Sequence, residues 1–97
     1  MNILDKLPPK SGEIFDKLLT CKNVEIAHII SSSKFEDKTY NQEEDEFVIV
    51  LKGKALLHVN NQEIVLNVGE HIFIPKHTIH KIISCEENTH WLAIYIK

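Results

Sequence analysis

Two short segments contain side chains of the kinds that bind metal ions in proteins. Glu46 begins an apolar run that ends at Gly53, and further along the chain His77 and His80 follow Pro75. Carboxylates and imidazoles are common ligands of divalent transition metals. If folding brings the two segments together, we expect them to form part of a metal site.

The residues before the apolar run indicate which acid faces inward. Because side chains two residues apart in an extended chain lie on one face, every second residue from Tyr40 to Glu46 shares the inward face of the strand that follows. A carboxylate there must be paired, hydrogen-bonded or bound to a metal, since an unpaired buried charge is costly. The intervening Glu43 and Asp45 are expected to face solvent.

The histidines differ in what their surroundings indicate. His80 begins an apolar strand and is the better partner for the carboxylate. On a regular strand His77 would point away from His80, but a turn before His80 would let both converge; a place for His77 at the cavity mouth or surface stays open. His28 lies on an apolar strand face, which favours a hydrogen-bonded histidine of the core or cavity. His90 opens the last strand and is expected to be exposed.

Short apolar runs that alternate with polar turns predict the strands that hold these residues. From Val24 onward the apolar period is two, and turn signals recur roughly every 8–12 residues. Asn60 and Asn61 fit a two-residue hairpin, because asparagine tolerates a positive φ. The pattern predicts an all-β fold, with a small antiparallel barrel over residues 24–97.

Residues 1–23 are expected to form an N-terminal arm with a short helix. Pro8 and Pro9 favour an extended entry. Two apolar pairs spaced four residues apart within 14–19, with Ser11 as N-cap, predict a helix of two or three turns. Such a helix is too short to be stable alone, so it would dock on the barrel.

Composition narrows the class of protein. The chain has 97 residues, 43% of them hydrophobic and 26% charged, with a net charge of −3. These values predict one globular domain with no affinity for nucleic acid, since no basic stripe is present. No apolar run reaches the roughly 20 residues needed to span a bilayer, and no secretory signal begins the chain. Cys21 and Cys85 form no paired motif, so we expect a reduced cytoplasmic protein without a membrane partner.

The two segments together resemble the motifs of the cupin family, and the likeness extends from about Val24 to Ile96. The first cupin motif ends in glutamate, six residues and glycine, and the second has glycine, proline and histidine at fixed spacing. The matching residues are Glu46, Gly53, Gly69, Pro75 and His80. The resemblance implies a jelly-roll barrel, the double-stranded β-helix, of the kind found in small single-domain bacterial cupins of poorly defined activity.

The resemblance also implies a metal site, with departures from the family pattern. Metal-binding cupins place three histidines and one glutamate on a divalent ion. Here Tyr40 and Gln42 stand where that pattern has its paired histidines, and His77 stands at a glycine position of the second motif. The ligand set implied for Fe, Mn, Ni or Zn comprises Gln42, Glu46, His77 and His80.

Three functions are consistent with these residues. The first is a cytoplasmic cupin that holds a divalent metal and a small polar metabolite in its cavity. As an enzyme of unassigned reaction, it would use Tyr40 or His28 for proton transfer. The alternative is a metal-free ligand-binding or sensing module in which Glu46 and His80 form a hydrogen-bonded pair. The third is a structural or regulatory dimer with a vestigial pocket.

The strand from Phe47 to Leu51 predicts a homodimer. It is apolar on both faces, and a barrel interior covers only one of them. Pairing of two copies across the other face would bury residues that otherwise form an exposed apolar patch.

Overall fold

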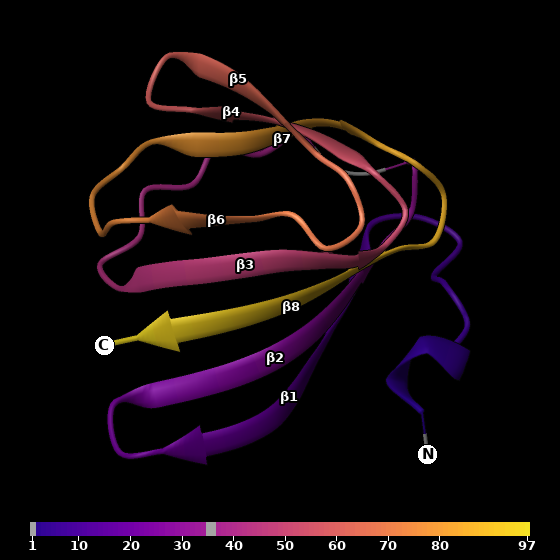
Figure 1. Cartoon of the computed structure of the whole chain (residues 1–97), viewed down its shortest axis with the longest axis horizontal. Coiled ribbons are helices and arrows are strands. Elements are labelled where there is room, and N and C mark those ends of the chain that lie inside the picture. Colours follow the sequence, from indigo (N-terminus) through magenta and orange to yellow (C-terminus); the bar gives the residue numbers. More distant parts are fainter. Residues whose placement is uncertain (1, 35–36) are drawn as a thin grey trace.

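The computed structural model describes residues 2–34 and 37–97, which form an antiparallel β-sandwich (Figure 1). A 3-10 turn, η1 (Ile3–Asp5), precedes the strands. The strands are β1 (Glu13–Cys21), β2 (Val24–Ser31), β3 (Asp45–Lys52), β4 (Ala55–Val59), β5 (Gln62–Leu66), β6 (His71–Ile74), β7 (His80–Cys85) and β8 (Thr89–Ile96). The predicted all-β fold is confirmed.

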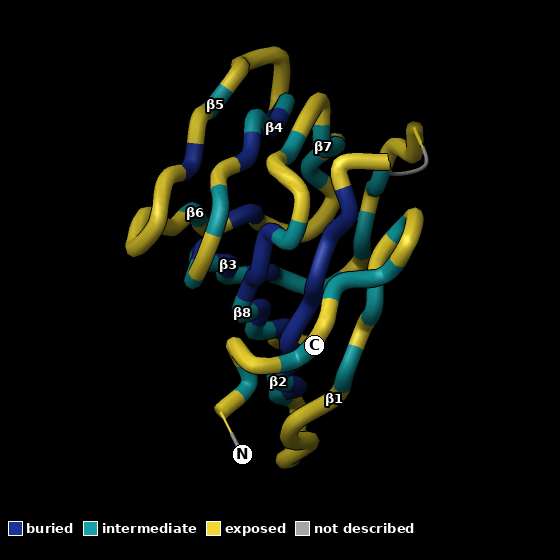
Figure 2. Tube along the Cα trace, turned by 90° about the vertical axis from the view of Figure 1, so that its right-hand side faces the viewer, coloured by how far each residue is buried: buried dark blue, intermediate teal, exposed yellow. Residues whose placement is uncertain are grey.

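Two sheets enclose the core. The larger has the strand order β1-β2-β8-β3-β6 and the smaller the order β5-β4-β7. Figure 2 shows buried segments along β2, β3 and β8, in the middle of the larger sheet, and mostly exposed residues on β1 and β5. The core residues that meet between the sheets are Ala27, Ile29, Val48, Val50, Ala55, Leu57, Val59, Leu66, Ile74, Trp91, Ala93 and Tyr95.

Strand β3, which lies between β8 and β6, has one buried face and one partly covered face. Val48 and Val50 point into the sandwich and are 4% and 0% exposed. Phe47 and Ile49 lie on the other face and are half-buried, as period-two alternation requires. On the neighbouring β6, Phe73 is opposite Phe47 and is 51% exposed. This outer face is the surface on which a homodimer would form, and the homodimer stays a prediction.

The helix predicted within 11–19 is wrong, because residues 13–19 belong to strand β1. β1 pairs with β2 along its length, with a register shift between Lys17 and Leu19. Residues four apart share a face on a strand as well as on a helix, so apolar pairs at that spacing fit either structure. Pairing with β2 supplies backbone hydrogen bonds that a two-turn helix, marginal in water, does not match. Within 2–34 and 37–97 no helix is long and apolar enough to cross a membrane.

Positive φ angles mark the turns that set the strand order. Asn60 and Asn61 have φ of 48° and 66°, which confirms the two-residue hairpin between β4 and β5. Gly53, in the turn from β3 to β4, has a φ of 88° and lies against Thr89 at the start of β8. The glycine that ends the first motif therefore lets two chain segments approach closely.

Candidate functional site

A cavity of about 370 Å³ opens between the two sheets. Residues from both sheets and from the segment before β3 line it. They are Glu13, Phe15, Glu25, Ile29, Lys38, Tyr40, Gln42, Glu44, Glu46, Val48, Leu57, Ile74, His80, Lys81, Ile82, Trp91 and Tyr95. Apolar and polar side chains both line the cavity, as is typical of small-molecule sites.

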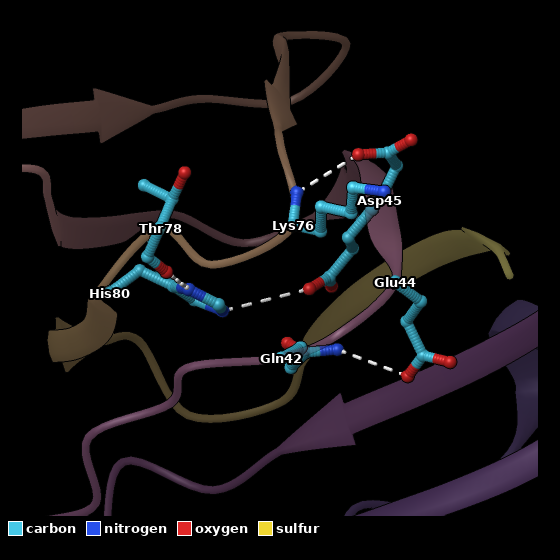
Figure 3. Close-up of polar contacts among 7 residues, drawn as sticks. Gln42, Glu44, Asp45, Lys76, Thr78 and His80 are labelled. Atoms are coloured by element: carbon cyan, nitrogen blue, oxygen red, sulfur yellow. Dashed lines mark hydrogen bonds and ion pairs between the residues drawn. The ribbon is translucent and has the colours of Figure 1, made fainter.

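The segment that leads into β3 alternates as predicted. Every second residue from Tyr40 to Glu46 lines the cavity, although β3 itself begins only at Asp45. Asp45 points away, and its Oδ1 accepts a hydrogen bond from the backbone N–H of Lys76 at 2.9 Å. Glu43 is exposed. The contact of Asp45 with Lys76 ties the cavity segment to the turn that precedes His80 (Figure 3).

Glu46 and His80 form the polar centre of the cavity. Glu46 Oε1 lies 3.6 Å from His80 Nε2, and both side chains are nearly buried, at 11% and 12% exposed. His80 Nδ1 lies 2.9 Å from the Thr78 carbonyl oxygen and donates to it. The carbonyl therefore fixes the ring so that Nε2 faces the carboxylate (Figure 3).

The surroundings of His80 favour its protonated form. Burial by itself lowers the pKa of His80, but the Glu46 carboxylate and the Thr78 carbonyl outweigh burial, and the pKa lies above its ordinary value. As an imidazolium, the ring donates from Nδ1 to the Thr78 carbonyl and forms an ion pair with Glu46 through Nε2. The imidazolium and the carboxylate thus neutralise each other.

Tyr40 covers the other side of the His80 ring. The two rings stack with centroids 5.6 Å apart and an interplanar angle of 20°. Their backbones are also joined, because Tyr40 N–H donates to the His80 carbonyl at 2.8 Å and His80 N–H donates back at 3.0 Å. Lys38 Nζ lies 5.1 Å from the centroid of the Tyr40 ring. Tyr40 is therefore a fixed wall of the site.

His77 has a backbone role. Its φ is 64°, in the left-handed region that favours glycine, which agrees with its place at a glycine position of the motif. Its N–H donates to the Gln42 carbonyl at 2.7 Å. His77 is exposed, and it is not among the residues that line the cavity.

The donors gathered at the cavity do not fit a transition-metal site. Of the four predicted ligands, the structure brings Glu46 and His80 together. The Gln42 amide nitrogen instead donates to Glu44 Oε1 at 3.4 Å. In the described parts of the chain, no three His, Cys, Asp or Glu side chains lie close enough to hold a metal ion, whereas protein sites for these metals commonly use three or more such ligands. The metal site stays a prediction.

The cavity glutamates Glu13 and Glu25 were not predicted. Glu25 and Glu46 occupy the strands on either side of Tyr95, each directly opposite it in register. The signal that could have identified Glu25 as a cavity residue is its spacing of two from Ala27, which places both side chains on one strand face. Ala27 is buried in the structure. Glu13 gave no such signal, because its segment has the spacing of a helix.

His28 lies on the outer face of the large sheet and does not border the cavity. Its Nε2 lies 2.9 Å from His90 Nδ1, and the two residues are 1% and 0% exposed. The prediction that His90 is exposed is wrong. His90 belongs to the middle strand β8, and the N-terminal arm reaches this face, where Lys6 contacts Asp16 at 3.0 Å and Asp16 is opposite His28 in register. Of the two proton-transfer candidates, only Tyr40 lines the cavity.

Comparison with known proteins agrees with the fold and the motif spacing. A family model described as a cupin domain matches residues 30–95. A "putative mannose-6-phosphate isomerase" from Ralstonia eutropha JMP134 is 28% identical over 100% of this chain and 96% of its own, with a TM-score of 0.88.

Two more distant structures show likeness of fold alone. An RmlC-like cupin from Shewanella frigidimarina NCIMB 400 is 16% identical, with a TM-score of 0.80 over 94% of this chain and 82% of its own. Fe(II)-HppE is 15% identical, with a TM-score of 0.76 over 88% of this chain and 50% of its own. No curated protein sequence matches.

Proposed function

Because the chain belongs to the cupin family, with its cupin domain over residues 30–95, we propose that its cavity binds a small polar organic molecule without a resident metal ion. The observation that carries this proposal is the pairing of Glu46 with His80 at 3.6 Å. A buried carboxylate needs a partner, and here the imidazole supplies it.

The remaining polar groups are placed for a ligand in the cavity. The second oxygen of Glu46 is an acceptor, and a protonated His80 is a donor. The Gln42 amide and the ring of Tyr40 border the same space. A volume of about 370 Å³ lies within the range of small-molecule pockets. The apolar side chains of the walls would exclude water, so a few polar contacts would fix the ligand's orientation.

A metal-dependent site is the second candidate, and one observation favours it. The Thr78 carbonyl holds the Nδ1 side of His80 and leaves Nε2 toward Glu46, which is how metal-bound histidines are commonly oriented. The similar fold named Fe(II)-HppE is an iron protein by its name. With Tyr40 and Gln42 at the family's histidine positions, however, this chain lacks the donors that such a site needs.

We also propose a cytoplasmic location. Cys21 and Cys85 are both free thiols, and free thiols persist in the reducing cytoplasm. Cell fractionation with an antibody to the chain measures the location, and recovery of most of the protein outside the cytoplasm would contradict it.

Thermal-shift screening of protein treated with a chelator tests the binding proposal. A polar ligand at about 100 times its Kd stabilises the folded state by about 2.7 kcal/mol, which raises Tm by roughly 10–20 °C in a domain of this size. Glu46→Gln and His80→Gln should lose the response. Glu63→Gln, an exposed glutamate of β5 outside the cavity, should keep it. Circular dichroism verifies that each variant is folded. A response that requires added divalent metal would contradict the proposal.

A further inference from the structure

Two buried glutamates lie side by side with a tyrosine in the cavity wall. On β8, Tyr95 is opposite Glu25 of β2 on one side and Glu46 of β3 on the other. Both glutamates are 8% exposed. Side chains directly opposite each other in adjacent strands lie on the same face within about 4.5–5.5 Å, so two carboxylates flank one phenol. Glu25 has a partner in Lys17 at 3.2 Å, but the Lys17 side chain is 64% exposed and reaches in from outside the cavity.

Two further carboxylates act on the same space. Glu13 and Glu44 also line the cavity. Burial, together with the charges of Glu46, Glu13 and Glu44, raises the pKa of the Tyr95 hydroxyl. The pKa of Glu13 is raised by burial and by Glu46, against the opposing charge of Lys38. Four carboxylates therefore line the cavity, together with the ammonium groups of Lys38 and Lys81 and the imidazole of His80.

The ammonium groups lie at the rim and have other contacts. Lys81 Nζ lies 3.5 Å from Asp37 Oδ1, and the Lys81 side chain is 37% exposed. Lys38 is exposed, with its Nζ over the ring of Tyr40. An anion that passed both lysines would meet His80, whose Nε2 already faces Glu46, and the carboxylates of Glu13, Glu25 and Glu44, which disfavour an anion.

Aromatic rings complete the inner wall. Trp91, Tyr40 and Tyr95 border the cavity, and Phe15 lies beside Tyr95 with ring centroids 6.1 Å apart. The face of an aromatic ring attracts cations, most strongly where water is excluded. Rings and carboxylates together form an environment that suits positive charge on an apolar body.

We propose that the ligand of this cavity is a small organic cation of the alkylammonium type, held beside the Glu25–Tyr95–Glu46 row and against the ring of Trp91. This inference rests on the proposed function, because it names the ligand class of the same site. The Glu13 and Glu44 carboxylates, which are more exposed than Glu25 and Glu46, would draw the cation in.

Three probes of similar size separate charge from shape. Tetramethylammonium and tert-butanol are nearly the same shape and differ in charge, and acetate carries the opposite charge. Isothermal titration of the full chain after exhaustive chelation, at constant ionic strength, measures all three. Tetramethylammonium should bind at least about tenfold more tightly than either other probe, since cation–π and carboxylate contacts act together.

Matched variants locate the effect. Glu13→Gln combined with Glu44→Gln should weaken tetramethylammonium binding about fivefold or more, because both charges face the cavity. These substitutions leave the Glu46–His80 pair unchanged. The control Glu63→Gln should stay within about twofold of the parent, as expected for a remote exposed charge.

Several results would overturn the inference. They are acetate or tert-butanol binding as tightly as tetramethylammonium, a double variant equal to the parent, and the absence of binding by tetramethylammonium. Preference for acetate would leave the proposed function standing. Binding of any probe only after divalent metal is restored would instead refute the proposed function.

Discussion

Replacing Gly53 with alanine should destabilise the protein more than the same change at Gly69. The two glycines have nearly equal φ angles, 88° and 84°, so the backbone strain is the same. A Cβ at Gly53 would lie 2.5 Å from Thr89 Oγ1 and 2.9 Å from Thr89 Cα, whereas a Cβ at Gly69 meets nothing within 4 Å. Thr89 is held in place, since it is 0% exposed and its hydroxyl donates to the Glu86 carbonyl at 2.7 Å.

The magnitude follows from two costs at Gly53 and one at Gly69. A residue other than glycine in the left-handed region costs about 1–2 kcal/mol. Alanine also restricts the unfolded chain, which offsets about 0.4–1 kcal/mol. The net loss at Gly69 is therefore about 1 kcal/mol. Overpacking against Thr89 adds roughly 1–3 kcal/mol, which gives about 2–4 kcal/mol at Gly53.

Urea unfolding followed by circular dichroism measures both losses, and thermal unfolding checks them. Each kcal/mol should lower Tm by about 4–8 °C in a domain of this size. Equal losses in the two variants would refute the reasoning, because the close approach of the β3–β4 turn to β8 would then carry no cost. A larger loss for Gly69→Ala would refute it as well.

Ionisation and assembly give three further tests. Burial lowers the pKa of His28 and of His90 below 6.5. The stability that the neutral pair contributes is therefore fully present above pH 6.5 and is lost as pH falls through the folded pKa values. NMR titration should place both midpoints below 6.5, and midpoints at the ordinary histidine value would contradict this. Although burial lowers the pKa of His80, hydrogen bonds raise it above 6.5, so the stability it contributes is fully present below pH 6.5 and is lost as pH rises through the folded pKa. Glu46→Gln should lower that midpoint, and no change would count against the pair. Light scattering should find a dimer for the parent chain and a monomer for Phe73→Glu, because a charge would interrupt the outer apolar face; a monomeric parent would contradict the dimer.

Local periodicity predicted the strands well and failed where a strand departs from regularity. The alternation from Tyr40 to Glu46 was correct because adjacent residues of an extended chain must face opposite ways. The helix predicted within 11–19 was wrong because residues four apart share a face on a strand as well as on a helix, so apolar pairs at that spacing do not separate the two. β1 also has a bulge between Lys17 and Leu19, which depends on the partner strand and is not encoded in local periodicity.

Burial on the outer face also depends on contacts that are distant in sequence. His90 was predicted to be exposed because it follows a polar bend. In the structure it is covered, since β8 is the middle strand of five and His28 donates to it from the neighbouring strand. Neither fact can be read from the residues around His90.

Only part of the candidate site was predicted, because the rest comes from segments that are distant in sequence. Glu46 and His80 belong to motifs with fixed spacing, and the structure places them 3.6 Å apart. Glu25 and Glu13 come from strands at the other end of the sequence and reach the cavity through the order of the sheet. The acidic character of the cavity is therefore a property of the topology.

Metal content tests the central claim that the Glu46–His80 pair works without an ion. Untagged protein from cells grown in metal-replete medium, analysed by inductively coupled plasma mass spectrometry, should hold well below one transition-metal ion per chain, with no difference between the parent and the Glu46→Ala and His80→Ala variants. A content near one ion per parent chain that is lost in both variants would contradict the claim.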